Sequence, residues 1–99
     1  MEFLVDMVTT VPAGTTEQEV ADMRAREAAH SKDLAAAGSL VRLWRPPLAP
    51  GEWCTWGLFR AADADELSRV LVSMPLRVWR HDTVTPLSPH PNDPGGSDA

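Results

Sequence analysis

The sequence contains a single cysteine, Cys54, so it forms no disulfide within the chain and is compatible with a reducing compartment. The stretch WCTW around this cysteine is aromatic and strand-like, and we interpret Cys54 as a small buried residue rather than a nucleophile. The histidines, His30, His81 and His90, show no close ligand spacing, while a structural zinc site needs about four convergent nitrogen or sulfur ligands. We therefore expect no metal site.

Basic residues are scarce as well. Nine Lys and Arg stand against 14 Asp and Glu, which gives a net charge of −5, and Lys32 is the only lysine. The scattered arginines form no basic stripe of the kind that binds phosphates along a nucleic acid. We expect no nucleic-acid partner.

Long apolar runs are also missing, since none approaches the roughly 20 residues of a membrane-spanning helix. The first residues, MEFLVDMV, carry the acids Glu2 and Asp6 in place of the basic leader of a secretion signal. These features predict a cytoplasmic protein with no membrane partner. With 99 residues and 43% hydrophobic content, the chain suits one compact domain whose small core often gains from self-association.

Six stretches have the patterns of regular secondary structure. Period-two alternation and β-branched or aromatic residues indicate strands, whereas apolar residues at three- and four-residue steps indicate helices. The predicted strands cover residues 2–9, 39–46, 52–60 and 76–87, and the predicted helices follow a cap at Thr15 or Thr16 and a cap at Asp63. Gly38 ends the first helix and Pro75 the second, while a Pro- and Gly-rich connection separates the two middle strands.

The resulting order βαββαβ is that of the ferredoxin-like split βαβ unit, an α+β fold in which both helices cover one face of an antiparallel sheet. The other face carries Leu4, Val8 and tryptophan side chains, and a second copy of the chain is its simplest cover. We expect a sheet-to-sheet homodimer, a dimeric α+β barrel. The predicted domain covers residues 1–87, and residues 88–99 form a Pro-, Gly- and Asp-rich tail that neighbouring subunits bury.

One residue of the first helix breaks its pattern. Helical phase places Glu27 at the centre of the apolar stripe formed by Val20, Met23 and Leu34, where a leucine would be expected. A carboxylate in a partly apolar pocket is poorly solvated when charged, which suits it to accept a proton as a general base. The alternative is a buried glutamate that pairs with an arginine such as Arg45 or Arg42 for structural reasons.

Several short motifs, in order and at this length, match a known family over nearly the whole chain. They are MEFLVDM at the start, Glu27 in the first helix, LWRPP at 43–47, PGEW at 50–53, SMPL at 73–76 and TPLSPHPNDP at 85–94. On these residues the chain resembles muconolactone delta-isomerase.

The resemblance implies a ferredoxin-like fold, sheet-to-sheet dimers in a larger ring that is commonly a decamer, and a pocket between helix and sheet near subunit contacts. It implies no cofactor. The family reaction, in the beta-ketoadipate pathway of aromatic catabolism, shifts a proton and a double bond to convert muconolactone to 3-oxoadipate enol-lactone, and related members remove halide from chlorinated muconolactones.

The resemblance favours Glu27 as the residue that moves the proton. Arg45 is the candidate for binding the substrate carboxylate, because a guanidinium holds two oxygens at once. Trp44, Trp53 and Trp56 could wall the pocket, and His30 could relay the proton of Glu27. The structural alternatives are a loop-anchoring arginine, core or interface tryptophans and a surface histidine.

Two other functions stay open at this stage. A family member could have been reassigned to another isomerase, cyclase or dehalogenase reaction, since function belongs to the site and scaffolds are reused. The chain could also be a non-catalytic module that binds a small ligand or supports an assembly.

Overall fold

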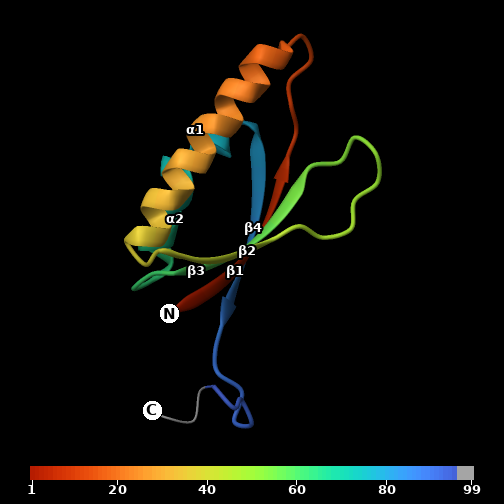
Figure 1. Ribbon diagram of the computed structural model, residues 1–99. Helices are drawn as coiled ribbons and strands as arrows, with labels where there is room; N and C mark the ends of the chain where they lie inside the picture. Colours follow the sequence, from red (N-terminus) through yellow and green to blue (C-terminus); the bar gives the residue numbers. More distant parts are fainter. Residues whose placement is uncertain (96–99) are drawn as a thin grey trace.

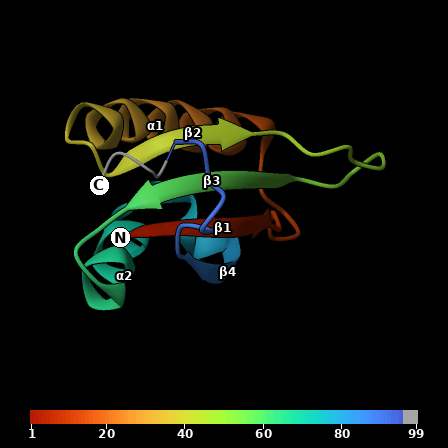
Figure 2. The same cartoon turned by 90° about the horizontal axis from the view of Figure 1, so that it is seen from below.

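Four strands and two long helices make up the fold in the computed structural model, which describes residues 1–95 (Figure 1). The antiparallel sheet has the strand order β2-β3-β1-β4, which Figure 2 shows from below. In chain order the elements are β1 (Glu2–Thr9), α1 (Glu17–Ala36), β2 (Leu40–Trp44), β3 (Cys54–Arg60), α2 (Ala64–Ser73), the short 3-10 helix η1 (Pro75–Trp79) and β4 (Arg80–Leu87). This is the predicted ferredoxin-like arrangement.

Both helices lie on the same side of the sheet (Figures 1 and 2). The alternation of β1 explains why, because Phe3, Val5 and Met7 are buried beneath the helices while Leu4 and Val8 point to the opposite side. The core combines these residues with others from β3, α2 and the segment after α2, among them Phe59, Leu67, Leu71 and Met74. The side that the helices leave uncovered is called the open face below.

The ends of α1 follow from local chemistry at the predicted positions. The Thr16 side chain accepts the backbone N–H of Glu19 at 3.1 Å, which caps the first turn. At the other end Gly38 has a φ of +83°, and its N–H and that of Ser39 donate to the carbonyls of Ala35 and Leu34. This is the hydrogen-bond pattern of a Schellman motif, which favours glycine at that position.

The start of the last strand was predicted wrongly. The alternation in LRVWRHD reads as a strand from Leu76, but residues 75–79 form η1 and pairing with β1 begins at Arg80 opposite Thr9. Pro75 supplies the fixed φ that suits the first residue of a helical turn, and Leu76 is buried while Val78 is 76% exposed. On a strand Leu76 and Val78 would share a face, whereas the turn of 3-10 helix packed against α1 buries Leu76 and leaves Val78 exposed.

Residues 88–95 contain no helix or strand and are exposed, and the chain runs away from the helices after β4 (Figure 1). The last part of the predicted tail, residues 96–99, lies outside the described residues. Among residues 1–95 no helix is long and apolar enough to cross a membrane.

We predict that Gly57→Ala destabilises the fold. A Cβ on Gly57 in β3 would lie 2.6 Å from Phe59 Cε1, 2.9 Å from Met7 Cε and 3.3 Å from a Leu43 methyl carbon. Because Phe59 is fully buried, it has little room to move, and overpacking of this kind costs about 1–3 kcal/mol. Urea unfolding measures the loss of unfolding free energy.

The matched control is Gly95→Ala, whose added methyl group would meet, among residues 1–95, only a side-chain oxygen of Asp93 at 3.7 Å. Its unfolding curve should coincide with that of the parent. Equal stability of the two variants would contradict the close packing described at Gly57.

Candidate active site

A cavity of about 400 Å³ lies between α1, the sheet and the segment that precedes β4. Arg24, Glu27 and Ser31 of α1 line one side, and Met74, Leu76 and Arg80 line another. The sheet side is formed by Met7, Thr9, Leu43 and Thr55, with Arg45 and Trp53 at the two ends of the β2–β3 connection. The walls thus combine apolar side chains with a few polar and charged groups, as in most small-molecule sites.

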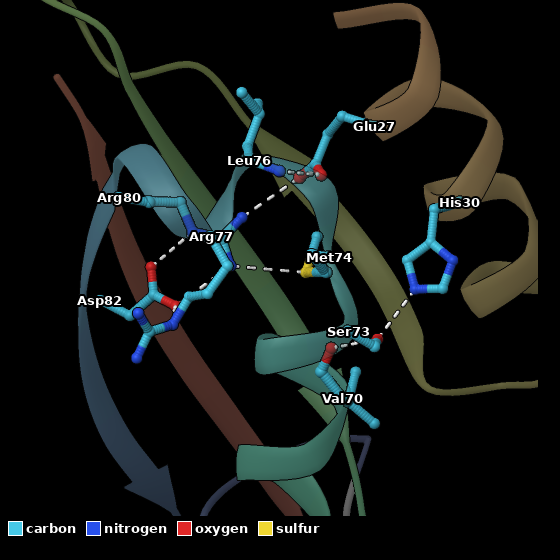
Figure 3. Close-up of polar contacts among 9 residues, drawn as sticks. All are labelled: Glu27, His30, Val70, Ser73, Met74, Leu76, Arg77, Arg80 and Asp82. Carbon is cyan, nitrogen blue, oxygen red and sulfur yellow. Dashed lines mark hydrogen bonds and ion pairs between the residues drawn. The ribbon is translucent and has the colours of Figure 1, made fainter. Parts of the chain in front are cut away.

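Glu27 enters this cavity from α1 with both carboxylate oxygens held (Figure 3). Oε1 accepts the backbone N–H of Leu76 at 3.0 Å, and Oε2 accepts Nη1–H of Arg80 at 3.1 Å. The side chain is only 14% exposed. Since a carboxylate oxygen has two acceptor sites, each oxygen keeps one for a further partner.

Arg80 is the centre of the charged group behind Glu27. Its side chain is 2% exposed and makes a two-pronged contact with Asp82, from Nε to Oδ1 at 2.6 Å and from Nη2 to Oδ2 at 3.0 Å. The Asp82 side chain is 4% exposed, and its Oδ2 also lies 3.3 Å from Nε of Arg77. Two carboxylates and two guanidinium groups therefore balance one another, as buried charges require.

This arrangement changes the interpretation of Glu27. The sequence predicts a poorly solvated carboxylate in a partly apolar pocket, whereas the structure gives Glu27 two donors, one of them charged. The alternative of an arginine pair was right in kind, yet the partner is Arg80 and neither Arg45 nor Arg42. Arg42 instead lies over the ring of Trp44, 5.3 Å from its centroid.

Glu27, Arg45 and Trp53 are the three predicted site residues that the structure brings to the same cavity. Arg45 is exposed, directly after β2, with no ion pair among the described residues. Trp53, named with the other tryptophans, lines the cavity as well. Its ring lies under the guanidinium of Arg24, with Cζ 3.9 Å from the ring centroid.

Trp44 and Trp56 do not line the cavity, contrary to the sequence-based expectation. They are opposite each other in the β2–β3 pairing and lie on the open face, 40% and 42% exposed. The reason is strand parity: Leu43 and Thr55, their neighbours in sequence, are the residues that point to the helix side. Trp44 and Trp56 therefore contribute to the open face.

His30 also lies outside the cavity lining, although it follows Glu27 by one turn. Its Nε2 lies 2.8 Å from Oγ of Ser73, and that hydroxyl donates to the carbonyl of Val70 at 2.6 Å. With the hydroxyl proton engaged, Nε2–H of His30 is the donor to Ser73. Figure 3 shows this contact joining α1 to the end of α2, apart from Glu27.

Sequence reasoning missed Arg80, Asp82 and the N–H of Leu76. A signal for the first two was present, because Arg80 and Asp82 are two residues apart on a strand and therefore share a face. No pattern could indicate the Leu76 N–H, which is available only because the segment is η1 rather than a strand. Within residues 1–95, no three His, Cys, Asp or Glu side chains converge closely enough to hold a metal ion.

Cys54 is half-buried at the start of β3, on the open face. Its Sγ–H donates to Oδ1 of Asp6 at 3.1 Å. Burial, followed by the hydrogen bond and the negative charge of Asp6, raises the pKa of the Cys54 thiol from 9.0 to about 11. This supports the interpretation of Cys54 as unreactive.

Comparisons with known proteins agree with one another. The family model described as muconolactone delta-isomerase matches residues 1–93. Muconolactone Delta-isomerase of Cupriavidus pinatubonensis is 32% identical over 93% of this chain and 97% of its own length, and Muconolactone Delta-isomerase 1 of Acinetobacter lwoffii is 30% identical over 93% of each. A crystal structure of muconolactone isomerase superposes with a TM-score of 0.81 at 24% identity, covering 93% of both chains, and shows the same fold.

We predict slow alkylation of Cys54 whose rate keeps rising with pH. With a pKa of about 11, the thiolate fraction increases about tenfold per pH unit from pH 7 to 10, whereas an ordinary thiol levels off above 9. Mass spectrometry of the iodoacetamide adduct measures the rate, with a free thiol peptide beside it.

Asp6→Asn removes the negative charge and should raise the alkylation rate at pH 8, because the neutral thiol loses part of its stabilisation. A rate that levels off near pH 9 in the parent, or no acceleration in the variant, would contradict the Asp6 contact.

Proposed function

The chain belongs to the muconolactone delta-isomerase family, a family of isomerases, and we propose that it converts muconolactone to 3-oxoadipate enol-lactone with Glu27 as the acid and base. The observation that carries the proposal is the composition of the cavity. Among the described residues that line it, Glu27 is the only acid, and no His, Cys or Lys accompanies it. Glu27 is therefore the one lining side chain suited to take and return a proton near neutral pH.

The reaction needs no more than one such group. Removal of the ring proton next to the double bond sends its electron pair through that bond to the lactone carbonyl, which gives a dienolate. The protonated Glu27 then returns the proton to the carbon next to the carbonyl, and the double bond ends one position along. Atoms and charge balance between substrate and product, so the proposed step calls for no cofactor.

The contacts of Glu27 fit this cycle. Leu76 N–H and Arg80 fix the position of the carboxylate, so that its remaining lone pairs are oriented before the substrate arrives. Asp82 balances the charge of Arg80, so the arginine keeps a partner when Glu27 becomes neutral. The apolar side chains of Met7, Leu43 and Met74 supply a surface for the ring.

Arg45 lies on the rim of the same cavity and carries a guanidinium with no carboxylate partner among the described residues. We propose that it orients the substrate carboxylate. His30, Trp44 and Trp56 have no part in the proposed step, because they do not line the cavity.

We also propose that the enzyme works as a homo-oligomer joined through the open face. Val8, Trp44 and Trp56 are 44%, 40% and 42% exposed there, beside Leu4 and Leu58, so the sheet presents an apolar surface. A surface of this kind on a small domain is typical of a subunit interface.

The first prediction of the proposal concerns Glu27→Gln. The amide cannot shuttle the proton, so kcat should fall at least about 10²–10⁴-fold, the usual contribution of a general base. The amide nitrogen must also face either Leu76 N–H or Arg80, so the variant should lose about 1–3 kcal/mol of unfolding free energy yet remain folded. Ultraviolet-monitored turnover of muconolactone and thermal unfolding measure the two effects.

The control is Glu17→Gln at the exposed start of α1, which should keep both turnover and stability. In deuterated water, the parent's product should retain part of the substrate's own hydrogen at the receiving carbon, because one carboxyl removes and returns it. A folded Glu27→Gln protein with parental turnover would remove the assignment, and a parent inactive on muconolactone would favour a reassigned reaction or a binding module.

The second prediction concerns assembly. Val8→Lys places a charge on the open face and should shift the protein toward smaller species in sedimentation at micromolar concentration. Val72→Lys, the same change at a 63% exposed position of α2, should leave the assembly intact. A parent that sediments as a stable monomer would contradict the proposed oligomer.

A further inference from the structure

The stacked pair of Arg24 and Trp53 lies at the edge of the cavity. Arg24 comes three residues before Glu27 on α1, so the two side chains project from the same face of the helix, and both line the cavity. The guanidinium carbon lies 3.9 Å from the centroid of the Trp53 ring. This contact joins α1 to the residue that precedes β3.

Trp53 is well placed to hold the arginine. Its carbonyl accepts the backbone N–H of Thr9 at 2.9 Å, which fastens this end of the β2–β3 connection to the end of β1. Its side chain is half-buried between the cavity and the connection. A guanidinium that lies flat on an indole keeps its N–H groups at the edge of the plane, where they remain available as donors.

Three arginines line the cavity, and they differ in whether a carboxylate pairs with them. Arg80 is engaged by Asp82 and Glu27, so it has little capacity left for a ligand. Arg24 and Arg45 have no ion pair among the described residues, although the chain as a whole has 14 acids and nine basic residues. Two unpaired guanidinium groups at one cavity, beside a held carboxylate, are suited to an anionic ligand.

We propose that Arg24, held flat by Trp53, binds the carboxylate of the substrate together with Arg45 and makes that carboxylate a requirement for tight binding. The inference rests on the proposed function and names the group that selects its substrate class, lactones with a carboxylate arm. Arg24 and Glu27 line the same cavity, so a carboxylate bound at Arg24 leaves the attached ring in the cavity that holds the Glu27 carboxylate. In this proposal Arg24 contributes to substrate binding, whereas Glu27 transfers the proton.

The test compares Arg24→Gln with the parent on muconolactone and on its methyl ester. A lost charge-assisted contact should raise KM for the acid about 10- to 100-fold and leave kcat within a few-fold. The ester has no charge to recognise, so its kcat/KM should be the same in both proteins. Trp53→Leu should raise KM for the acid by a smaller factor, because Arg24 stays but loses its support.

Arg69→Gln is the matched control, since Arg69 is an exposed arginine of α2 that lines no part of the cavity, and its KM should stay at the parental value. Thermal unfolding of each variant shows that it is folded at the assay temperature. The inference is overturned if KM for the acid is unchanged in Arg24→Gln, or if kcat/KM falls equally for the acid and the ester. In either case the proposed function still stands as long as the parent turns over muconolactone.

If the parent does not turn over muconolactone, the proposed function fails and the carboxylate site is still tested by calorimetry. The probes are the muconolactone acid and its methyl ester, titrated into the parent and into Arg24→Gln. Acid binding that weakens about 10-fold or more in the variant supports the site. Equal binding of acid and ester by the parent, or no binding of either, overturns it.

Discussion

The contact between Arg80 and Asp82 is the interaction on which the site depends. Both side chains are almost fully buried, and the pair is geometrically specific because two N–H groups meet two oxygens. With Asp82 in place, Arg80 offers its remaining N–H to Glu27. Without that aspartate the buried guanidinium would keep Glu27 as its one carboxylate partner among the described residues, and two of its N–H groups would lose their acceptors. The position of Glu27 therefore depends on Asp82, a residue that lines no part of the cavity.

The same interaction connects the site to the fold. Arg80 is the first residue of β4 and pairs with Thr9, so the network lies where the sheet, η1 and α1 meet. Leu76 contributes twice, with a buried side chain and with the N–H that holds Glu27. The cavity is therefore framed by groups that also pack the protein, while Arg24, Arg45 and Trp53 lie around it with fewer structural contacts.

The fold was predictable because its signals are local: strand alternation in β1, the caps at Thr16 and Asp63, and the glycine after α1. Glu27 was found for the same reason, as an exception to a regular stripe. The partners of Glu27 depend on tertiary packing. The residues of η1 alternate in the sequence like those of a strand, although the structure buries Leu76 and leaves Val78 exposed. The presence of three tryptophans near the β2–β3 connection did not indicate which of them line the cavity. The alternation of side chains along the strands places Trp44 and Trp56 on the open face, whereas Trp53, at the end of the connection, lies on the cavity side.

The distances along the chain within the Glu27 network have a consequence for how the site comes into being. Leu76 and Arg80 are 49 and 53 residues away from the glutamate they hold. Contacts this distant in sequence form only after long loops close, so they belong to the slow part of folding rather than to helix formation. During synthesis, α1 and its carboxylate leave the ribosome well before their donors, and the Glu27 network can form only once the last quarter of the polypeptide has emerged.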